Sequence, residues 1–317
     1  MAIVKTSRQK RKTALIGWLF VAPLLIYFLV FQLAPILMSF GISFTEWNWR
    51  SSLTFVGFQN YIELFTNRIL YPNFWKSLWV TIQYMLMSVP LSVVVTLIVS
   101  AMLNSKVKGE KFFKSAFFIP SVTAGVAISA IWMFLIDPTY GVIGAINRAW
   151  GTNINLLGRT ATALPLMAIM AVWSGLGYNV LIMLSAMKNI NPSLYEACEI
   201  DGGGAIRKFF HVTLPGVAPT ILFLCVTSTI GSLQAFDQMY LMTGGGPDGS
   251  TTTFMLEIYN MIFSYQEVGT ASAMSYVLFS LILVITIVGQ WFLPANRERR
   301  EQRRKEKHGK DIAPCQQ

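Results

Sequence analysis

The sequence contains few charged residues. Only 13% of its 317 residues are Asp, Glu, Lys or Arg, whereas soluble globular domains carry about 25%. Hydrophobic residues make up 54%, and the mean hydropathy is +0.52. This shortage of charge argues against a water-soluble enzyme, a nucleic-acid-binding domain and a disordered regulator. It indicates an integral membrane protein.

Cysteine and histidine are also scarce. The three cysteines, Cys198, Cys225 and Cys315, form no CxxC pair, so neither a disulfide framework nor a zinc site is expected. Two histidines, His211 and His308, are too few for a histidine metal cluster or an HExxH site. The phosphate-binding pattern GxxxxGK[ST] is missing as well. We therefore expect no catalytic residues, no metal and no cofactor bound by this chain.

Long apolar runs dominate what is present. A helix needs about 20 mostly apolar residues to cross the hydrocarbon core of a bilayer. Six stretches meet that requirement: 14–40, 75–103, 112–136, 163–187, 217–242 and 271–293. The first contains an apolar run longer than the 7–15 residues of a cleavable signal core, so we interpret it as an uncleaved helix. The prediction is an all-α membrane protein with six transmembrane helices, the last five forming a core at 75–293.

Basic residues are distributed unequally between the two sides that six spans define. Twenty of the 25 Lys and Arg residues lie in the N-terminal segment 1–13, the loops 104–114 and 188–216, and the tail 294–317. The positive-inside rule then places both termini in the cytoplasm. The tail is a dense charge run, which we interpret as a solvated flank that touches anionic membrane lipid. No nucleic-acid partner is expected.

Two outer loops have distinctive compositions. Within residues 41–74, Phe55, Phe58, Ile62 and Phe65 recur at helical spacing, which predicts a short amphipathic helix. Such aromatics are typical either of anchoring at the membrane interface or of a docking surface for another protein. The last outer loop opens with TGGGP from residue 243, which predicts a turn.

The inner loop 188–216 is longer than a chain reversal requires. Asn191 followed by Pro192 is a typical start of a helix, and three glycines from Gly202 stop it. A second short helix, AIRKFFHV, then leads to Leu214-Pro215, where we expect it to end. Two such short helices are marginal in water and would gain stability by docking on other surfaces.

This loop resembles the EAA loop of permease subunits in binding-protein-dependent ABC importers. Tyr195 to Gly203 reads YEACEIDGG, and Phe209 to Pro215 reads FFHVTLP. The matches in spacing are Glu196, Ala197, Gly202, Leu214 and Pro215; Cys198, Gly203 and Val212 replace the family's common Ala, Ala and Ile. The motifs WLFVAP, FVGFQNY and LMTGGGP resemble the sugar and glycerol-phosphate branch of the maltose-type permeases. The similarity spans about residues 14–293.

The resemblance implies a permease of the bacterial plasma (inner) membrane that works with separate subunits for ATP hydrolysis and for cargo binding. The loop would seat in a cleft of an ABC ATPase dimer, which binds the ATP; a second homologous permease and an extracytoplasmic substrate-binding protein complete the importer. Glu196 would be the charged anchor, Ala197 and Gly202 would allow close approach, and the aromatic stripe would supply apolar area. The residues assigned to ATPase coupling are Glu196, Ala197, Asp201, Gly202, Ile206, Phe209, Phe210, Leu214 and Pro215. The implied cargo is a sugar, oligosaccharide, polyol or glycerol phosphate.

Polar and aromatic side chains in the fourth and fifth spans are candidates for a substrate path. They are Trp173, Tyr178, Asn179, Gln234, Asp237 and Gln238. Amides, hydroxyls and aromatic faces suit a polyol ligand, but the same residues could serve only hydrogen bonds between helices. The sequence is compatible with both interpretations.

Two other functions are alternatives to the importer. An ion-coupled secondary transporter normally keeps ionisable residues within its spans; the candidates are Asp137, interpreted as a loop cap, and Asp237. A CDP-alcohol phosphotransferase is suggested by the run from Asp201 to Arg207, but its spacing is off by one and the acidic pair that would complete a magnesium site is missing.

Overall fold

A computed structural model describes residues 7–50, 52–105 and 109–292. The chain divides into two compact units, one of Met1–Tyr71 with Ile258–Val277 and one of Pro72–Glu257 with Leu278–Gln317. Residues 1–6 of the expected N-terminal segment and the expected basic tail 294–317 lie outside the described residues.

The described residues contain five helices that are long and apolar enough to cross a membrane, and up to six if a bent pair counts as one span. The first, Leu15–Ile42, consists of α1 (Ser7–Phe28), a π-helical turn (Leu29–Leu33) and α2 (Ala34–Ile42). The others are α4 (Asn73–Asn104), α8 (Thr160–Lys188), the helical segment Ala205–Leu233 and α14 (Val268–Phe292). The all-α prediction is confirmed, and the six predicted spans agree with the structure when the bent pair is counted as one span.

The third expected span, 112–136, is not one straight helix. It consists of α5 (Glu110–Ser121) and α6 (Gly125–Ile136), which meet at an angle of 102°. Helix α5 ends at Ser121, one residue after Pro120, and Ala124 adopts an extended backbone (φ −58°, ψ 135°). Mean hydropathy over the stretch could not reveal this break, because the residues on both sides of it are apolar.

The fifth expected span, 217–242, also has different bounds. Helix α11 runs from Leu214 to Leu233, and α12 (Asp237–Thr243) follows after a break. The Thr253 hydroxyl donates a hydrogen bond to the Ala235 carbonyl at 2.8 Å, which satisfies a backbone group that the break leaves unpaired. At its other end the helix does not stop at Leu214-Pro215: α10 (Ala205–Lys208) continues through a π-helical turn (Phe209–Thr213) into α11.

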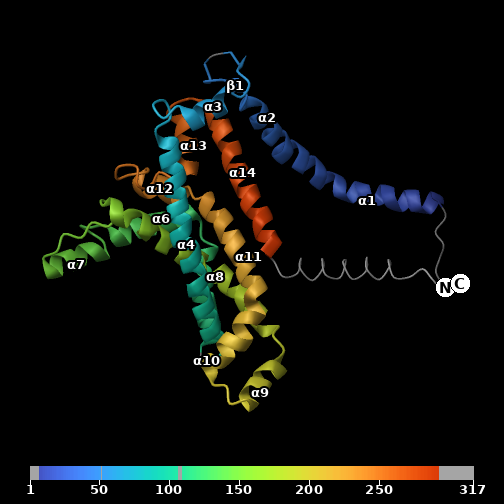
Figure 1. The fold of residues 1–317 in the computed structure, drawn as a ribbon, viewed down its shortest axis with the longest axis vertical. Helices are drawn as coiled ribbons and strands as arrows, with labels where there is room; N and C mark the ends of the chain where they lie inside the picture. Colours follow the sequence, from blue (N-terminus) through green and yellow to red (C-terminus); the bar gives the residue numbers. More distant parts are fainter. Residues whose placement is uncertain (1–6, 51, 106–108, 293–317) are drawn as a thin grey trace, which may run out of the picture. The chain divides into compact units, whose positions relative to one another are not determined.

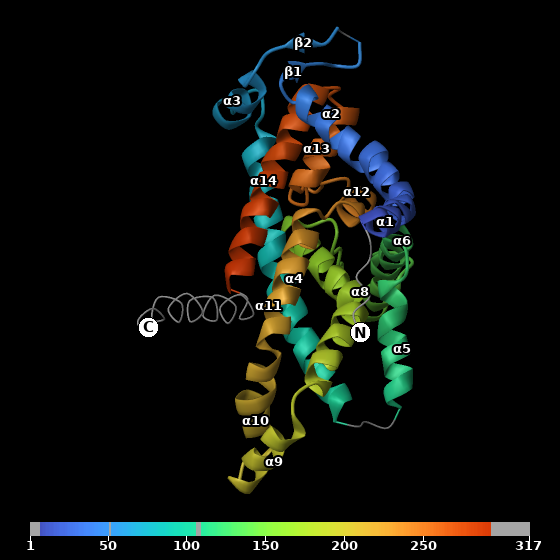
Figure 2. The ribbon, with the colours of Figure 1, turned by 90° about the vertical axis from the view of Figure 1, so that its right-hand side faces the viewer.

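The core of the larger unit is formed where α8 packs against α4 and α11 (Figure 1). Two clusters of buried side chains fill these contacts: Leu103, Leu176, Val180 and Leu184, and Met183, Met187, Val217 and Leu224. Helix α5 packs on α8 as well (Figure 2). There a Cβ at Gly177 would lie 2.2 Å from the Phe117 carbonyl oxygen, so the two helices approach each other at a glycine.

The smaller unit contains a short hairpin next to α2. Strands β1 (Thr45–Glu46) and β2 (Thr54–Phe55) are antiparallel, with Thr45 opposite Phe55. Helix α3 (Gln59–Thr66) follows, and its Asn60 side chain donates to the carbonyls of Ser43 and Thr45 at 2.9 and 3.0 Å.

The amphipathic helix expected in this loop therefore exists, but it starts later than predicted. Phe55 belongs to β2 and not to the helix, because the chain turns at Gly57, which has a φ of +61°. Phe55, Phe58, Ile62 and Phe65 are all exposed, whereas Asn60 and Leu64 are buried. The stripe is thus exposed, as both a membrane anchor and a docking surface require, although the Phe58 ring also packs edge-on against Phe44 with centroids 5.1 Å apart.

The remaining helices are short. Helix α7 (Val142–Trp150) follows α6, and α13 (Phe254–Phe263) precedes α14. The predicted turn at Gly244–Pro247 is present, with a φ of +59° at Gly244 and +93° at Gly245. Threonine hydroxyls hold it, since Thr251 donates to the Gly246 carbonyl at 2.8 Å.

Candidate functional site

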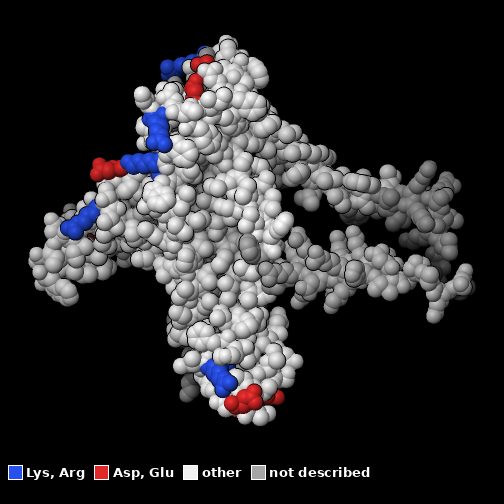
Figure 3. Space-filling view, in the orientation of Figure 1, with Lys and Arg blue, Asp and Glu red and all other residues white. Residues whose placement is uncertain are grey.

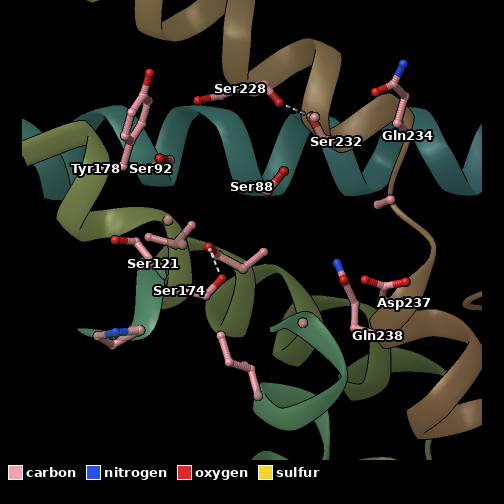
Figure 4. A pocket seen from close by; sticks show the side chains of 18 of the residues that line it. Ser88, Ser92, Ser121, Ser174, Tyr178, Ser228, Ser232, Gln234, Asp237 and Gln238 are labelled. Carbon is pink, nitrogen blue, oxygen red and sulfur yellow. Dashed lines mark hydrogen bonds between the residues drawn. The ribbon is translucent and has the colours of Figure 1, made fainter. Parts of the chain in front are cut away.

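A cavity of about 600 Å³ lies in the larger unit. Its wall comes from α4, the break between α5 and α6, α8, the end of α11 and the start of α12 (Figure 4). Both helix breaks that the hydropathy pattern missed therefore border the same space. Irregular backbone at membrane depth is tolerated where it lines such a cavity.

The wall is polar, although the surrounding helices are apolar. Its polar side chains are Tyr84, Ser88, Ser92, Ser121, Thr123, Ser174, Tyr178, Asn179, Thr227, Ser228, Ser232, Gln234, Asp237 and Gln238. Hydroxyls and amides provide both donors and acceptors of hydrogen bonds. Among the described residues that form this lining, Asp237 is the one carboxylate, and none is Lys, Arg or His.

Two hydrogen bonds fix polar groups of the wall. The Gln238 amide donates to the Tyr84 hydroxyl at 2.7 Å, and Tyr84 is only 1% exposed. The Asn179 amide donates to the Ser92 hydroxyl at 3.1 Å, which joins α8 to α4. These amides are therefore held in place by neighbouring helices and present their remaining groups to the cavity.

Asp237 lies at the first position of α12, with its side chain exposed. Its carboxylate lies against Gly125, the first residue of α6: a Cβ on that glycine would be 2.8 Å from Oδ2. Asp237 makes no hydrogen bond or ion pair within the part of the chain that the structure describes. Figure 4 shows Asp237 and Gln238 side by side at the cavity.

Five of the six residues proposed for the substrate path line this cavity: Tyr178, Asn179, Gln234, Asp237 and Gln238. Trp173 does not belong to the lining; its ring packs edge-on against Trp132, with centroids 5.9 Å apart. Sequence reasoning missed the hydroxyl residues of the wall. The spacing of Ser88 and Ser92, four residues apart and therefore on one face of α4, is a signal that could have found them.

Asp137, the other acidic residue considered for ion coupling, caps a loop. Its Oδ1 accepts hydrogen bonds from the backbone N–H groups of Thr139 at 2.8 Å and Tyr140 at 2.7 Å. These bonds lower the pKa of the Asp137 carboxyl below its ordinary value. They give the residue a structural role, and Asp137 does not line the cavity.

The second candidate site is the loop at 188–216, where α9 (Pro192–Ile200) starts as predicted. The Asn191 side chain accepts a hydrogen bond from the Ser193 N–H at 3.1 Å, so Asn191 is the N-cap. After the helix, Gly202 has a φ of +76°, a conformation that glycine adopts without strain. A Cβ on Gly203 would lie 2.5 Å from the Cys198 sulfur and 2.6 Å from its carbonyl oxygen, so this bend requires glycine.

Two contacts connect the loop to the start of the following helix. The Lys208 ammonium pairs with the Glu199 carboxylate at 3.0 Å, and the Tyr195 and Thr213 hydroxyls are 3.0 Å apart. The helix continues past Pro215 through a π-turn, in which the Leu214 N–H bonds to the Phe209 carbonyl five residues back. Pro215 has no N–H to donate, and the wider turn accommodates this loss without ending the helix.

The residues assigned to coupling mostly lie on the surface. Ile206 is 77% exposed and Phe210 is 56% exposed, whereas Phe209 and Leu214 are half-buried. Glu196, Ala197, Asp201, Gly202 and Pro215 are exposed. Glu196 has no hydrogen bond or ion pair to any described residue. Figure 3 shows acidic and basic side chains together where α9 and α10 end the unit, beyond uncharged helix surfaces.

Comparisons with known proteins agree with this arrangement. Residues 61–298 match the family model of the binding-protein-dependent transport system inner membrane component. The chain is 36% identical to the lactose transport system permease LacF of Rhizobium radiobacter, over 95% of this chain and 100% of that protein. It is 32% identical to the trehalose/maltose permease MalF of Thermococcus litoralis, over 93% and 98%.

A solved structure has the same fold. A chain of a bacterial ABC transporter involved in the import of the acidic polysaccharide alginate superposes with a TM-score of 0.77 at 21% identity, covering 90% of this chain and 96% of that one. The chain described here belongs to the family of binding-protein-dependent transport inner membrane components. It is a multi-pass permease subunit of an ABC importer, a transport protein that is not an enzyme and binds no cofactor itself.

Proposed function

We propose that this permease passes a sugar or a related polyhydroxylated cargo through the cavity and is driven through the loop at 188–216. Its complex consists of an ABC ATPase dimer, a second homologous permease and an extracytoplasmic substrate-binding protein. The cargo class comprises sugars, oligosaccharides, polyols and glycerol phosphate. The relatives named above, which are lactose and trehalose/maltose permeases, support a sugar.

The cavity wall is the observation that carries this proposal. Hydroxyls and amides outnumber every other polar group there, and a polyol offers many hydroxyls that both donate and accept. A purely structural role for these groups would pair them with one another across the helices. Tyr178 and Gln234 have no such hydrogen bond among the described residues, so their polar groups are available to a ligand.

The loop supports the partner assignment. Ile206 and Phe210 are exposed apolar side chains of this loop, and Glu196 of the same loop is exposed and pairs with no described residue. Exposed apolar side chains and an unpaired charge in one loop suit a docking site. We assign this surface to the ATPase, with Glu196 as the charged anchor and the glycine bend allowing close approach.

A pull-down tests the whole assembly. The tagged chain is purified in mild detergent from its native membrane and its partners are identified and counted by mass spectrometry. We expect two ATPase copies and a second permease, with the ATPase lost when residues 193–212 are replaced by a glycine-serine linker. A chain recovered alone, in a stable form and without an ATPase, would contradict the proposal and favour an ion-coupled transporter.

The cargo is tested separately with the copurified binding protein. The material it carries is released by denaturation and identified by mass spectrometry. A carbohydrate or polyol supports the proposal, whereas an amino acid, peptide or metal chelate overturns the cargo assignment. This second readout does not depend on whether the complex survives detergent.

A further inference from the structure

The charge of the cavity wall restricts the cargo more narrowly than its polarity does. Of the residues that line it, one is an acid and none is a base. Anionic ligands such as sugar phosphates and uronates are normally held by Arg or Lys, which pair with the charge directly. The described part of the wall has no group of that kind.

Asp237 gives the wall a net negative charge. Its carboxylate lies at the N-terminus of the 12-residue helix α6, where the helix dipole contributes about half a positive charge. That partial charge stabilises the carboxylate without cancelling it. Among the described residues no cation pairs with Asp237, so its negative charge acts on a ligand in the cavity.

A carboxylate in this position suits a neutral polyol. It only accepts hydrogen bonds, and bonds from neutral hydroxyls to a charged acceptor are about twice as strong as those to a neutral one. The Gln238 amide next to it is held by Tyr84, so acceptor and amide are presented together. A phosphate or uronate at the same place would bring two like charges together, and their repulsion disfavours binding.

We infer that this permease is selective for uncharged sugars or polyols over anionic ones, and that Asp237 is the residue in its half of the path that enforces this. The inference rests on the proposed function, because it assumes that cargo passes through the cavity. It narrows the cargo to neutral saccharides and excludes glycerol phosphate, sugar phosphates and uronate oligosaccharides.

The sign of the electrostatic potential in the cavity is measured with a cysteine introduced into its wall. The complete transporter carries Ser228→Cys in a background of Cys198→Ala, Cys225→Ala and Cys315→Ala, in lipid nanodiscs at low ionic strength. The rates of modification by a cationic and an anionic methanethiosulfonate reagent are compared with their rates on a free thiol. We expect the cationic reagent to be favoured by about tenfold.

Two variants assign this preference to its source. Asp237→Asn should bring the ratio close to that of the free thiol. Asp248→Asn removes an exposed acid that does not line the cavity, and it should leave the ratio unchanged. An anionic reagent that reacts as fast as the cationic one in the parent protein, or an unchanged ratio in Asp237→Asn, would overturn the inference.

The cargo class is then determined by asking which added compounds slow the modification of the same cysteine by uncharged N-ethylmaleimide. The neutral panel contains lactose, maltose and trehalose; the anionic panel contains glucose 6-phosphate, glycerol 3-phosphate and digalacturonate. Protection by a neutral sugar supports the inference, and protection by an anion overturns it. If no compound of either panel protects the cysteine, the ratio of the modification rates by the cationic and anionic reagents alone decides whether the inference holds. A non-carbohydrate cargo on the binding protein would overturn the proposed function and leave the reagent ratio as it is.

Discussion

The cavity and the loop at 188–216 are built in opposite ways. The cavity collects side chains from six helices, and its shape depends on two helix breaks. The loop is one continuous segment whose important side chains point away from their own unit. The first therefore depends on packing between distant parts of the chain, and the second on local backbone geometry. Substitutions in the two regions should consequently affect the protein differently.

The largest effect is expected from Glu196→Lys. The side chain has no described partner within the chain, so folding and membrane insertion should be unchanged. Reversing its charge at a docking surface costs several kcal/mol, and uptake by the complex in proteoliposomes should fall by about 100-fold.

Glu199→Gln is the matched control on the same helix. Glu199 is exposed but pairs with Lys208 inside the loop, and an exposed pair contributes little. Uptake should stay within about twofold of wild type. An equal loss of uptake in both variants would show that the total negative charge of this surface matters, and not Glu196 in particular.

The second effect concerns the glycine bend. In Gly203→Ala the new methyl group would lie 2.5 Å from the Cys198 sulfur and 2.6 Å from a backbone oxygen. Because the backbone atom cannot move aside cheaply, the bend should be destabilised by about 1–3 kcal/mol. Hydrogen exchange of residues 192–213 should accelerate while the core of α8 keeps its protection.

Gly204→Ala provides the comparison, since a Cβ there meets nothing within 4 Å and its φ is −72°. Its exchange rates should match those of the wild type. If both substitutions loosened the loop equally, the close approach at Gly203 would not explain the bend.

These two regions also differ in how far the sequence could predict them. The helix start at Asn191 and the glycine stop followed from local rules, and the structure confirms both. The break after Ser121 and the one after Leu233 did not follow, because hydropathy averages over a break. What stabilises the second break is Thr253, a residue 18 positions away from the carbonyl it bonds. Such a long-range hydrogen bond leaves no local pattern.

A third, smaller effect is expected inside the cavity wall. Tyr84→Phe removes the acceptor of the Gln238 amide, and side-chain hydrogen bonds between membrane helices contribute about 0.6 kcal/mol on average. The melting temperature of the purified complex should fall slightly. Tyr178→Phe should leave it unchanged, because that hydroxyl has no partner among the described residues, yet it should lower cargo uptake. The reverse pattern would mean that Tyr84 contacts cargo and Tyr178 supports the fold.

The smallest effect is expected at Asp137. Backbone hydrogen bonds lower the pKa of its carboxyl from the ordinary value of 3.8, so the charged form stabilises the fold at neutral pH, and this contribution is lost as the pH falls through the lowered pKa. Asp137→Asn should lower the melting temperature slightly at pH 7, and the difference from wild type should shrink at about pH 3. A difference that grows on acidification would contradict this assignment.

The central claim is that the loop at 188–216 couples the permease to the ATPase and that the cavity passes the cargo. It is tested most directly by measuring ATP hydrolysis and cargo uptake together. The complete complex with its binding protein is reconstituted in proteoliposomes as wild type, Glu196→Lys and Asp237→Asn. We predict that Glu196→Lys loses both activities, whereas Asp237→Asn keeps hydrolysis stimulated by the binding protein and loses most uptake. An Asp237→Asn complex that loses stimulated hydrolysis to the same extent as Glu196→Lys, or a Glu196→Lys complex that transports at the wild-type rate, would contradict the account.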